Sequence, residues 1–218
     1  MVFTLNDISV YIFNWKKVTS NSLKLYETIS PIIKDTCIVN CDETHTLDAS
    51  IQHIQLDDSC YYGSQYDHAI KHVAENKIMC CIVGDNIHDN DFNKVFNSAT
   101  YAYNNVNAGV YAPHDKRTAH TDRLENIKDE LYDVPITDCG FWFIHPKIIA
   151  RLKNINYSVS RFGWGIDVIT IKESRKQGFL VMRDYSTETD QLDHTCGYDP
   201  DIAYRDMMKL LRVYNKLR

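Results

Sequence analysis

Short apolar runs alternate with amphipathic segments through the first hundred residues of the chain. Three runs have the character of strands, residues 8–13, 37–40 and 77–83. Apolar side chains recur at helical spacing in the segments that separate and follow them, residues 23–29, 66–73 and 92–103. The run 77–83 lacks the polar alternation of a half-exposed strand, as is typical of a strand buried on both faces of a parallel sheet.

The second half of the chain is less regular. Strands are expected at residues 109–112, 136–144 and 179–182, and helices from residues 146 and 200. Residues 114–130 are charged and nearly free of aliphatic side chains, which indicates an exposed loop. The whole pattern predicts an α/β sandwich in which helices flank a mostly parallel central sheet whose second half is mixed.

Composition narrows the class of protein. The 218 residues, 44% of them apolar, are enough for one sizeable core, and a net charge of −5 argues against a nucleic-acid partner. The longest apolar run, 78–83, is far too short for a transmembrane segment, and the first residues lack the pattern of a signal peptide. The seven cysteines include no Cys-x-x-Cys pair and lie mostly in strand-like runs, as reduced core thiols do. We therefore expect a soluble, cytoplasmic protein.

Polar residues follow three of the predicted strands. Asn14, Asp42 and Asp85 each stand at or just after a strand end. Each by itself has an ordinary explanation, because Asp and Asn often end strands in turns. Together they predict a pocket, since ligands of α/β sheets bind beyond the carboxyl ends of the strands. Mg²⁺ and Mn²⁺ take one or two carboxylates plus phosphate oxygens of the substrate, so the pocket suits a nucleotide with a divalent cation.

A second candidate site is the glycine-flanked tryptophan in residues 162–167. Gly163 and Gly165 let the backbone approach a ligand closely, and the indole of Trp164 offers a flat apolar face to a sugar ring. Asp167 follows at the start of a predicted helix and would face the same space. As an ordinary helix-capping carboxylate, it would contribute only about 0.5–2 kcal/mol of stability.

Taken together, five short segments resemble one family. They are residues 10–14, 39–42, 83–86, 137–142 and 163–167. From residue 8 to about residue 200, the sequence resembles nucleotide-sugar-dependent glycosyltransferases of the GT-A fold, and more closely the N-terminal domain of glycosyltransferases from large chlorella viruses. The resemblance implies a single domain over residues 1–218, with a nucleotide-binding half of about 1–105 and an acceptor-binding half of about 106–218. A viral origin would place the protein in the host cytoplasm.

The resemblance also implies roles for particular residues. In this family an Asp-x-Asp motif binds Mn²⁺ or Mg²⁺, which bridges the donor diphosphate; here Asp85 supplies one carboxylate of the motif and a late histidine, His194, is a second metal ligand. The implied donor-binding residues are Asn14, Asp42, Asp85 and Asn86. The implied acceptor-binding residues are Trp164 and Asp138, and Asp167 is the implied catalytic base.

The implied reaction is metal-dependent transfer of a hexose or deoxyhexose from a UDP-sugar to a glycan acceptor, with rhamnose among the candidate sugars. Asp167 as general base gives an inverting displacement, and a retaining reaction stays open. One alternative is a nucleotidyltransferase of related fold, which would carry a glycine-rich loop where this chain has residues 14–18 without glycine. The other alternative is a non-catalytic sugar- or nucleotide-binding module, which the incomplete Asp-x-Asp motif favours.

Overall fold

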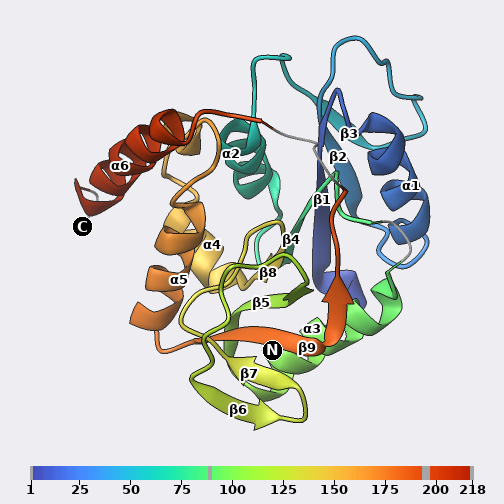
Figure 1. Cartoon of the computed structure of the whole chain (residues 1–218). Coiled ribbons are helices and arrows are strands. Elements are labelled where there is room, and N and C mark those ends of the chain that lie inside the picture. Colours follow the sequence, from blue (N-terminus) through green and yellow to red (C-terminus); the bar gives the residue numbers. More distant parts are fainter. Residues whose placement is uncertain (1, 88–89, 193–196, 217–218) are drawn as a thin grey trace.

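The computed structural model describes residues 2–87, 90–192 and 197–216 (Figure 1). The described strands are β1 (Ile8–Trp15), β2 (Thr36–Cys41), β3 (His53–Gln55), β4 (Ile78–Val83), β5 (Ala108–Asp115), β6 (Glu125–Lys128), β7 (Leu131–Asp133), β8 (Phe141–Ile144) and β9 (Leu180–Thr189). The α-helices are α1 (Thr19–Ile29), α2 (Tyr62–His72), α3 (Phe92–Asn105), α4 (Pro146–Leu152), α5 (Ile166–Lys176) and α6 (Pro200–Lys216). Two short 3-10 helices are η1 (Leu5–Asp7) and η2 (Tyr157–Val159). In these ranges no helix is long and apolar enough to cross a membrane.

One nine-stranded sheet runs through both halves of the chain in the order β3-β2-β1-β4-β8-β5-β9-β7-β6. The first four strands of this order are parallel, and β5 and β9 are also parallel. The other four pairings among the described residues are antiparallel, so the expectation of a mostly parallel sheet is wrong. A parallel neighbour requires a long crossover that is usually a helix, and residues 116–140, which connect β5 to its neighbour β8, contain no helix.

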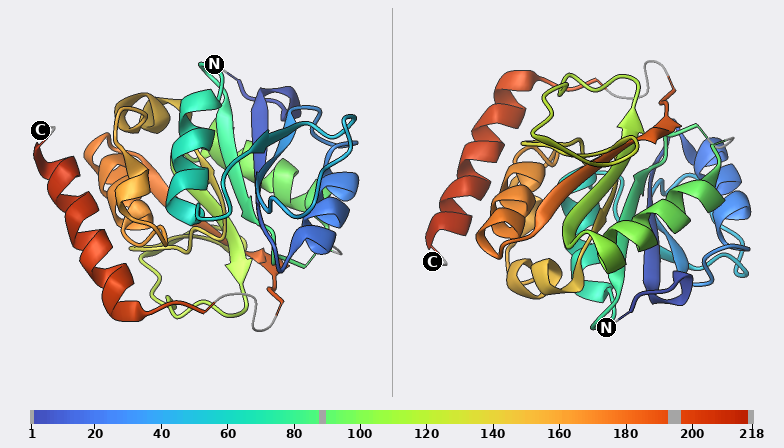
Figure 2. Two further views of the ribbon diagram at one scale, coloured as in Figure 1. Left: turned by 90° about the horizontal axis from the view of Figure 1, so that it is seen from above. Right: turned by 90° about the horizontal axis from the view of Figure 1, so that it is seen from below.

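Helices cover both faces of the sheet and give it two hydrophobic cores (Figure 2). The largely apolar strand β1 contributes to both cores, because alternate side chains of a strand point to opposite faces. Tyr11 and Phe13 pack with residues of α2, α4 and α5, whereas Val10 and Ile12 pack with residues of α1 and α3. The result is a three-layer α/β/α sandwich.

Strands β5 and β9 extend well past the ends expected from sequence. We expected strands at residues 109–112 and 179–182, but β5 reaches Asp115 and β9 reaches Thr189. Their pairing changes register between Pro113 and His114, where the partner residue shifts from Asp184 to Glu188. The extension carries polar side chains into the sheet. Residues 125–128 of the expected loop also form a strand, β6.

An ion pair ties α5 to the far part of the sheet. Arg175 donates from Nη1 and Nη2 to the two carboxylate oxygens of Asp133, at 2.9 and 2.7 Å. The Asp133 side chain is buried, and one of its oxygens also accepts the Val181 backbone N–H at 3.0 Å. This two-pronged geometry is the strong form of an arginine–carboxylate contact, so it fixes where α5 ends relative to β7 and β9.

Candidate active site

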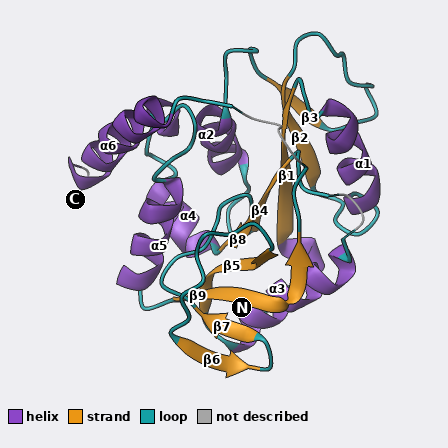
Figure 3. Ribbon diagram, viewed as in Figure 1, coloured by secondary structure: helices purple, strands orange, loops and turns teal. Residues whose placement is uncertain are grey.

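The parallel strands β1, β2 and β4 end at the same edge of the sheet, where long loops gather (Figure 3). Asn14 is the penultimate residue of β1, Asp42 directly follows β2, and Asp85 stands two residues after β4. The structure therefore brings these three predicted donor-binding residues to one edge.

Asn14 and Asp42 share a buried network of hydrogen bonds. Asn14 Nδ2 donates to Asn40 Oδ1 at 2.6 Å and to Thr19 Oγ1 at 3.1 Å, and Thr19 Oγ1 donates to Asp42 Oδ2 at 2.8 Å. Burial alone would raise the pKa of Asp42, but hydrogen bonds from Thr44 and Thr19 outweigh it and lower the pKa. The Asp42 carboxylate thus organises the loop after β2, and a contact with a nucleoside stays a prediction.

The loop after β4 is held by its neighbours on two sides. The backbone carbonyl of Asp85 accepts the N–H of Leu192 at 2.8 Å. Asn86 Nδ2 donates to the carbonyls of Val83 and Gly140 at 3.3 and 3.2 Å. The other side-chain atom of that amide, Asn86 Oδ1, is buried and has no hydrogen-bond partner among the described residues. The loop therefore holds the buried carboxylate of Asp85 next in the chain to an amide oxygen that still has its acceptor capacity.

These two oxygen-bearing side chains suit a hard cation in part. Asp85 and Asn86 offer the ligand types that Mg²⁺ and Mn²⁺ prefer. In residues 2–87, 90–192 and 197–216, no group of three or more His, Cys, Asp or Glu side chains is placed to hold a metal. His194 lies outside the described residues, so its expected role as a ligand stays a prediction. The described residues fit a cation that completes its coordination with water and substrate phosphate.

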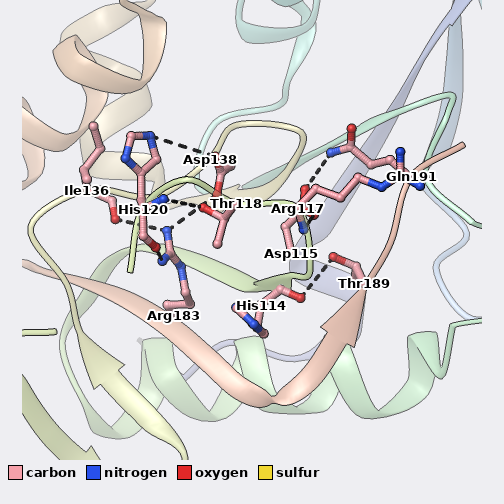
Figure 4. Close-up of polar contacts among 10 residues, drawn as sticks. All are labelled: His114, Asp115, Arg117, Thr118, His120, Ile136, Asp138, Arg183, Thr189 and Gln191. Carbon is pink, nitrogen blue, oxygen red and sulfur yellow. Dashed lines mark hydrogen bonds and ion pairs between the residues drawn. The ribbon is translucent and has the colours of Figure 1, made fainter. Parts of the chain in front are cut away.

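The sequence analysis missed a carboxylate at the end of β5, Asp115 (Figure 4). Asp115 is buried; its Oδ2 accepts Gln191 Nε2 at 2.6 Å and its Oδ1 accepts the Arg117 backbone N–H at 2.8 Å. Burial raises the pKa of Asp115, and the nearby charges of Asp138 and Asp190 raise it further. Gln191 also pairs with Asn86 through the backbone, so it connects Asp115 to the loop after β4.

Asp138, predicted to bind the acceptor, lies between the side chains of Arg183 and His120 (Figure 4). Arg183 Nη2 is 3.6 Å from Asp138 Oδ2, and His120 Nε2 is 4.0 Å from Asp138 Oδ1. The Arg183 side chain is wholly buried and donates to the backbone carbonyls of His120 and Ile136. A buried guanidinium with such partners positions the Asp138 carboxylate at the rim of the site, where 31% of that side chain is exposed.

Arg183 was also missed, because the strand predicted over 179–182 ended one residue before it. A longer strand assignment through the Tyr- and Thr-rich residues that follow would have placed Arg183 inside the sheet. A charged residue within such a strand indicates that polar partners surround it, because a buried charge is tolerated only when it is paired. This signal could have identified Arg183.

Asp167 lies in the first turn of α5, where Gly165 adopts the left-handed conformation as the N-cap. Burial raises the pKa of the Asp167 carboxyl, and backbone N–H groups and His120 partly offset that effect. Burial also raises the pKa of Cys139, with further contributions from the charges of Asp167 and Asp138. The carboxylates of Asp167 and Asp138 therefore both lie close enough to Cys139 to raise its pKa.

Tyr62 connects the two acceptor-side segments. Its hydroxyl donates to the Cys139 carbonyl at 2.6 Å, and its ring packs on Gly163, where a Cβ would overlap Tyr62 Cδ1. Gly163 has φ +81°, a conformation that strongly favours glycine. The same ring meets Phe13 of β1 edge-on, with 5.1 Å between centroids. Tyr62 thus sets the segments of Asp138 and Trp164 relative to the end of β1.

Solved structures of other proteins share this architecture. The structure of GalNAc-T7 with UDP, GalNAc and Mn²⁺ matches with a TM-score of 0.69 and 8% identity, over 94% of this chain and 48% of that one. A Bacillus anthracis protein assigned as a glucose-1-phosphate thymidylyltransferase, solved with sucrose, matches with a TM-score of 0.53 and 14% identity, over 95% of this chain and 99% of that one. The chain spans about half the length of GalNAc-T7. No family model and no curated protein matches the sequence.

The fold, a large mixed sheet between helices, is therefore similar to that of GT-A-like nucleotide-sugar transferases. This confirms the broader resemblance expected from the sequence. The comparisons lend no support to the narrower likeness to chlorella-virus enzymes.

Proposed function

We propose that this protein is a metal-dependent glycosyltransferase that uses a UDP-sugar as donor. One contact carries the proposal: the Gly140 carbonyl accepts hydrogen bonds from Val83 N–H at 2.8 Å and from Asn86 Nδ2 at 3.2 Å. These bonds set the segment of Asp138 directly beside the loop of Asp85. A donor held by the loop after β4 would thus meet an acceptor held by the segment before β8.

On the donor side, Asp85 and Asn86 would hold Mn²⁺ or Mg²⁺ together with diphosphate oxygens. When bound, the cation would neutralise the charge that develops on the leaving diphosphate. Asn14 and Asp42 would bind the nucleoside from the ends of β1 and β2, and their shared network keeps that side of the pocket rigid.

On the acceptor side, Asp167 would remove the proton from the attacking hydroxyl. Because burial raises its pKa, the Asp167 carboxylate is a stronger base than an exposed aspartate. Trp164 would hold the acceptor sugar and Asp138 would hydrogen-bond to it. The reaction is a single displacement with inversion that moves a hexose or deoxyhexose, rhamnose included, onto a glycan.

Two other functions are compatible with the fold. The likeness to a thymidylyltransferase favours a nucleotidyltransferase, but the loop at residues 14–18 has no glycine to wrap a triphosphate. A binding module without turnover is favoured by the incomplete Asp-x-Asp motif, in which Asp85 is the single carboxylate. Titration with UDP, followed by assays of hydrolysis and pyrophosphate release, distinguishes these two functions from a glycosyltransferase.

The experiment is titration calorimetry with UDP, with and without Mn²⁺, on the wild type, on Asp85→Asn and on Asp129→Asn. Asp129 is an exposed residue in the turn between β6 and β7 and provides the matched control. We expect Mn²⁺ to tighten UDP binding at least tenfold in the wild type and the control, and to have no effect in Asp85→Asn. UDP binding that is absent, or independent of Mn²⁺ in the wild type, would refute the proposal.

Hydrolysis of UDP-hexoses then distinguishes an enzyme from a binding module. Release of pyrophosphate from UTP and a sugar 1-phosphate would instead identify a nucleotidyltransferase. A protein that binds UDP with Mn²⁺ but shows neither reaction would be a binding module, and the glycosyltransferase assignment would fail.

A further inference from the structure

Four aromatic side chains gather on the surface beside the predicted acceptor site. They come from three segments that are distant in the sequence, namely Tyr61 before α2, Phe162 and Trp164 before α5, and Tyr198 before α6. We call these four residues the aromatic platform. Tyr61 and Tyr198 are exposed to 41% and 39%, although aromatic side chains of this size usually contribute to cores. Such an exposed group is a candidate for binding a ligand.

The rings of the platform form a continuous series. Phe162 stacks on Tyr198 with 4.6 Å between centroids, and Tyr61 meets Phe162 edge-on at 5.2 Å. Trp164 lies perpendicular to Tyr198 at 6.2 Å, and its Nε1–H donates to the Tyr198 hydroxyl at 2.9 Å. The guanidinium of Arg161 covers the Tyr61 ring at 4.1 Å. Each ring is therefore held in place by at least one other.

Buried backbone contacts support the platform from beneath. Ser160, which is wholly buried, donates from its hydroxyl to the Trp164 carbonyl at 2.8 Å. Gly63 N–H donates to the Arg161 carbonyl at 3.1 Å, and a Cβ on Gly63 would overlap the Ser160 carbonyl oxygen. The loop before α5 is thus fixed against the start of α2. A rigid platform loses little conformational entropy when it binds a ligand.

The chemistry of the platform suits sugars. Exposed rings pair with the apolar faces of pyranose rings, and the two tyrosine hydroxyls and Arg161 at the margins can hydrogen-bond to sugar hydroxyls. The platform is also continuous with the predicted acceptor site, because Trp164 belongs to both and Asp167 is three residues further on. A glycan whose end reaches Asp167 would extend over Tyr198 and Phe162 toward Tyr61.

We propose that the aromatic platform binds the inner sugar residues of an oligosaccharide acceptor, beyond the residue that receives the transferred sugar. The inference rests on the proposed function and names its substrate class: acceptors of at least two or three sugars are bound in preference to monosaccharides. Tyr198, at the centre of the series, contributes the largest share.

The test measures binding without turnover, using chitotriose, cellotriose and maltotriose against N-acetylglucosamine and glucose. Calorimetry and quenching of tryptophan fluorescence report on the full chain, with circular dichroism as the check on folding. We expect at least one trisaccharide to bind at least tenfold more tightly than its monosaccharide. Tyr198→Ala should weaken that binding by about tenfold, the loss expected for one stacked ring, whereas Tyr198→Phe should retain most of it.

Tyr101→Ala is the matched control. Tyr101 is 37% exposed and carries a cation, Lys128, over its ring at 4.5 Å, but it lies on α3, across the sheet from α2 and α5. Its replacement should leave trisaccharide binding unchanged. If no trisaccharide binds more tightly than its monosaccharide, or if Tyr198→Ala binds like the wild type, the platform is not a glycan subsite.

The outcomes for UDP and for sugars are separable. Loss of the trisaccharide preference with intact Mn²⁺-dependent UDP binding would overturn the subsite alone. The protein could instead bind a trisaccharide through Tyr198 but show no Mn²⁺-dependent binding of UDP. That result would overturn the glycosyltransferase function and support the glycan subsite.

Discussion

Protonation of one buried histidine should destabilise the fold as the pH falls. His145 is the N-cap of α4, and its Nδ1 accepts the Lys147 backbone N–H at 3.0 Å. The ring is 9% exposed and packs against Phe179 and Phe3, with centroids 4.8 and 5.4 Å away. Burial, followed by the positive charge of Lys147, lowers the pKa of His145 to about 4.

The direction and size of the effect follow from linkage. An unfolded histidine has a pKa of about 6.5, so between pH 6.5 and 4 the unfolded chain takes up a proton that the folded protein does not. The stabilisation from a neutral His145 is fully present above pH 6.5 and is lost as the pH falls toward 4. The loss amounts to about 2 kcal/mol at pH 5 and to about 3 kcal/mol at most.

Urea unfolding from pH 7.5 to pH 4.5 measures this contribution by comparing the wild type with His145→Asn. Asparagine can still accept the N–H of Lys147 as an N-cap, but it does not titrate. At pH 7.5 the variant should be less stable because ring packing is lost, and this difference should shrink by about 2 kcal/mol by pH 5. His53→Asn, at an exposed position on β3, should show no such trend. A constant difference between wild type and His145→Asn across the pH range would refute the reasoning.

Three further substitutions test the site and its framework. Asp167→Asn should lower sugar transfer by about 10²–10⁴ with UDP affinity nearly unchanged, and rates within a few-fold of wild type would favour another base. Gly163→Ala should lower the free energy of unfolding by about 3 kcal/mol, because the new Cβ would overlap Tyr62 and the residue has a positive φ. In Gly197→Ala the new Cβ would meet no described residue within 4 Å, so the free energy of unfolding should change by less than about 0.5 kcal/mol. Equal urea midpoints for these two would contradict the argument. Asp133→Asn should cost about 3 kcal/mol by leaving Arg175 without its counter-charge, and an unchanged unfolding midpoint would show that the pair is dispensable.

The sequence by itself determined the class of fold and the edge of the sheet that carries the site. The unbroken apolar run of β4 marked a strand buried on both faces, and strand–helix alternation predicted parallel strands in this half of the sheet, as β1 and β4 are. Parallel strands share an edge at their carboxyl ends, so Asn14 and Asp85 could be placed together without any structure. These inferences succeed because they depend on local periodicity and on a general rule of topology.

Only the tertiary structure decided the order and direction of the strands in the second half of the sheet. The same holds for the charged groups that surround Asp138. Periodicity reports which residues are buried, but not which strand lies beside them or in which direction it runs, so the reversal of β8 was not predictable. Arg183 is acceptable in the interior only because the carbonyls of His120 and Ile136 meet it there, and these lie 63 and 47 residues away in the chain. Asp115 likewise reaches the site only through the pairing of β5 with β9. Pairing between distant segments supplies the hydrogen-bond partners that offset the cost of burying a charge. No local pattern in the sequence encodes this pairing.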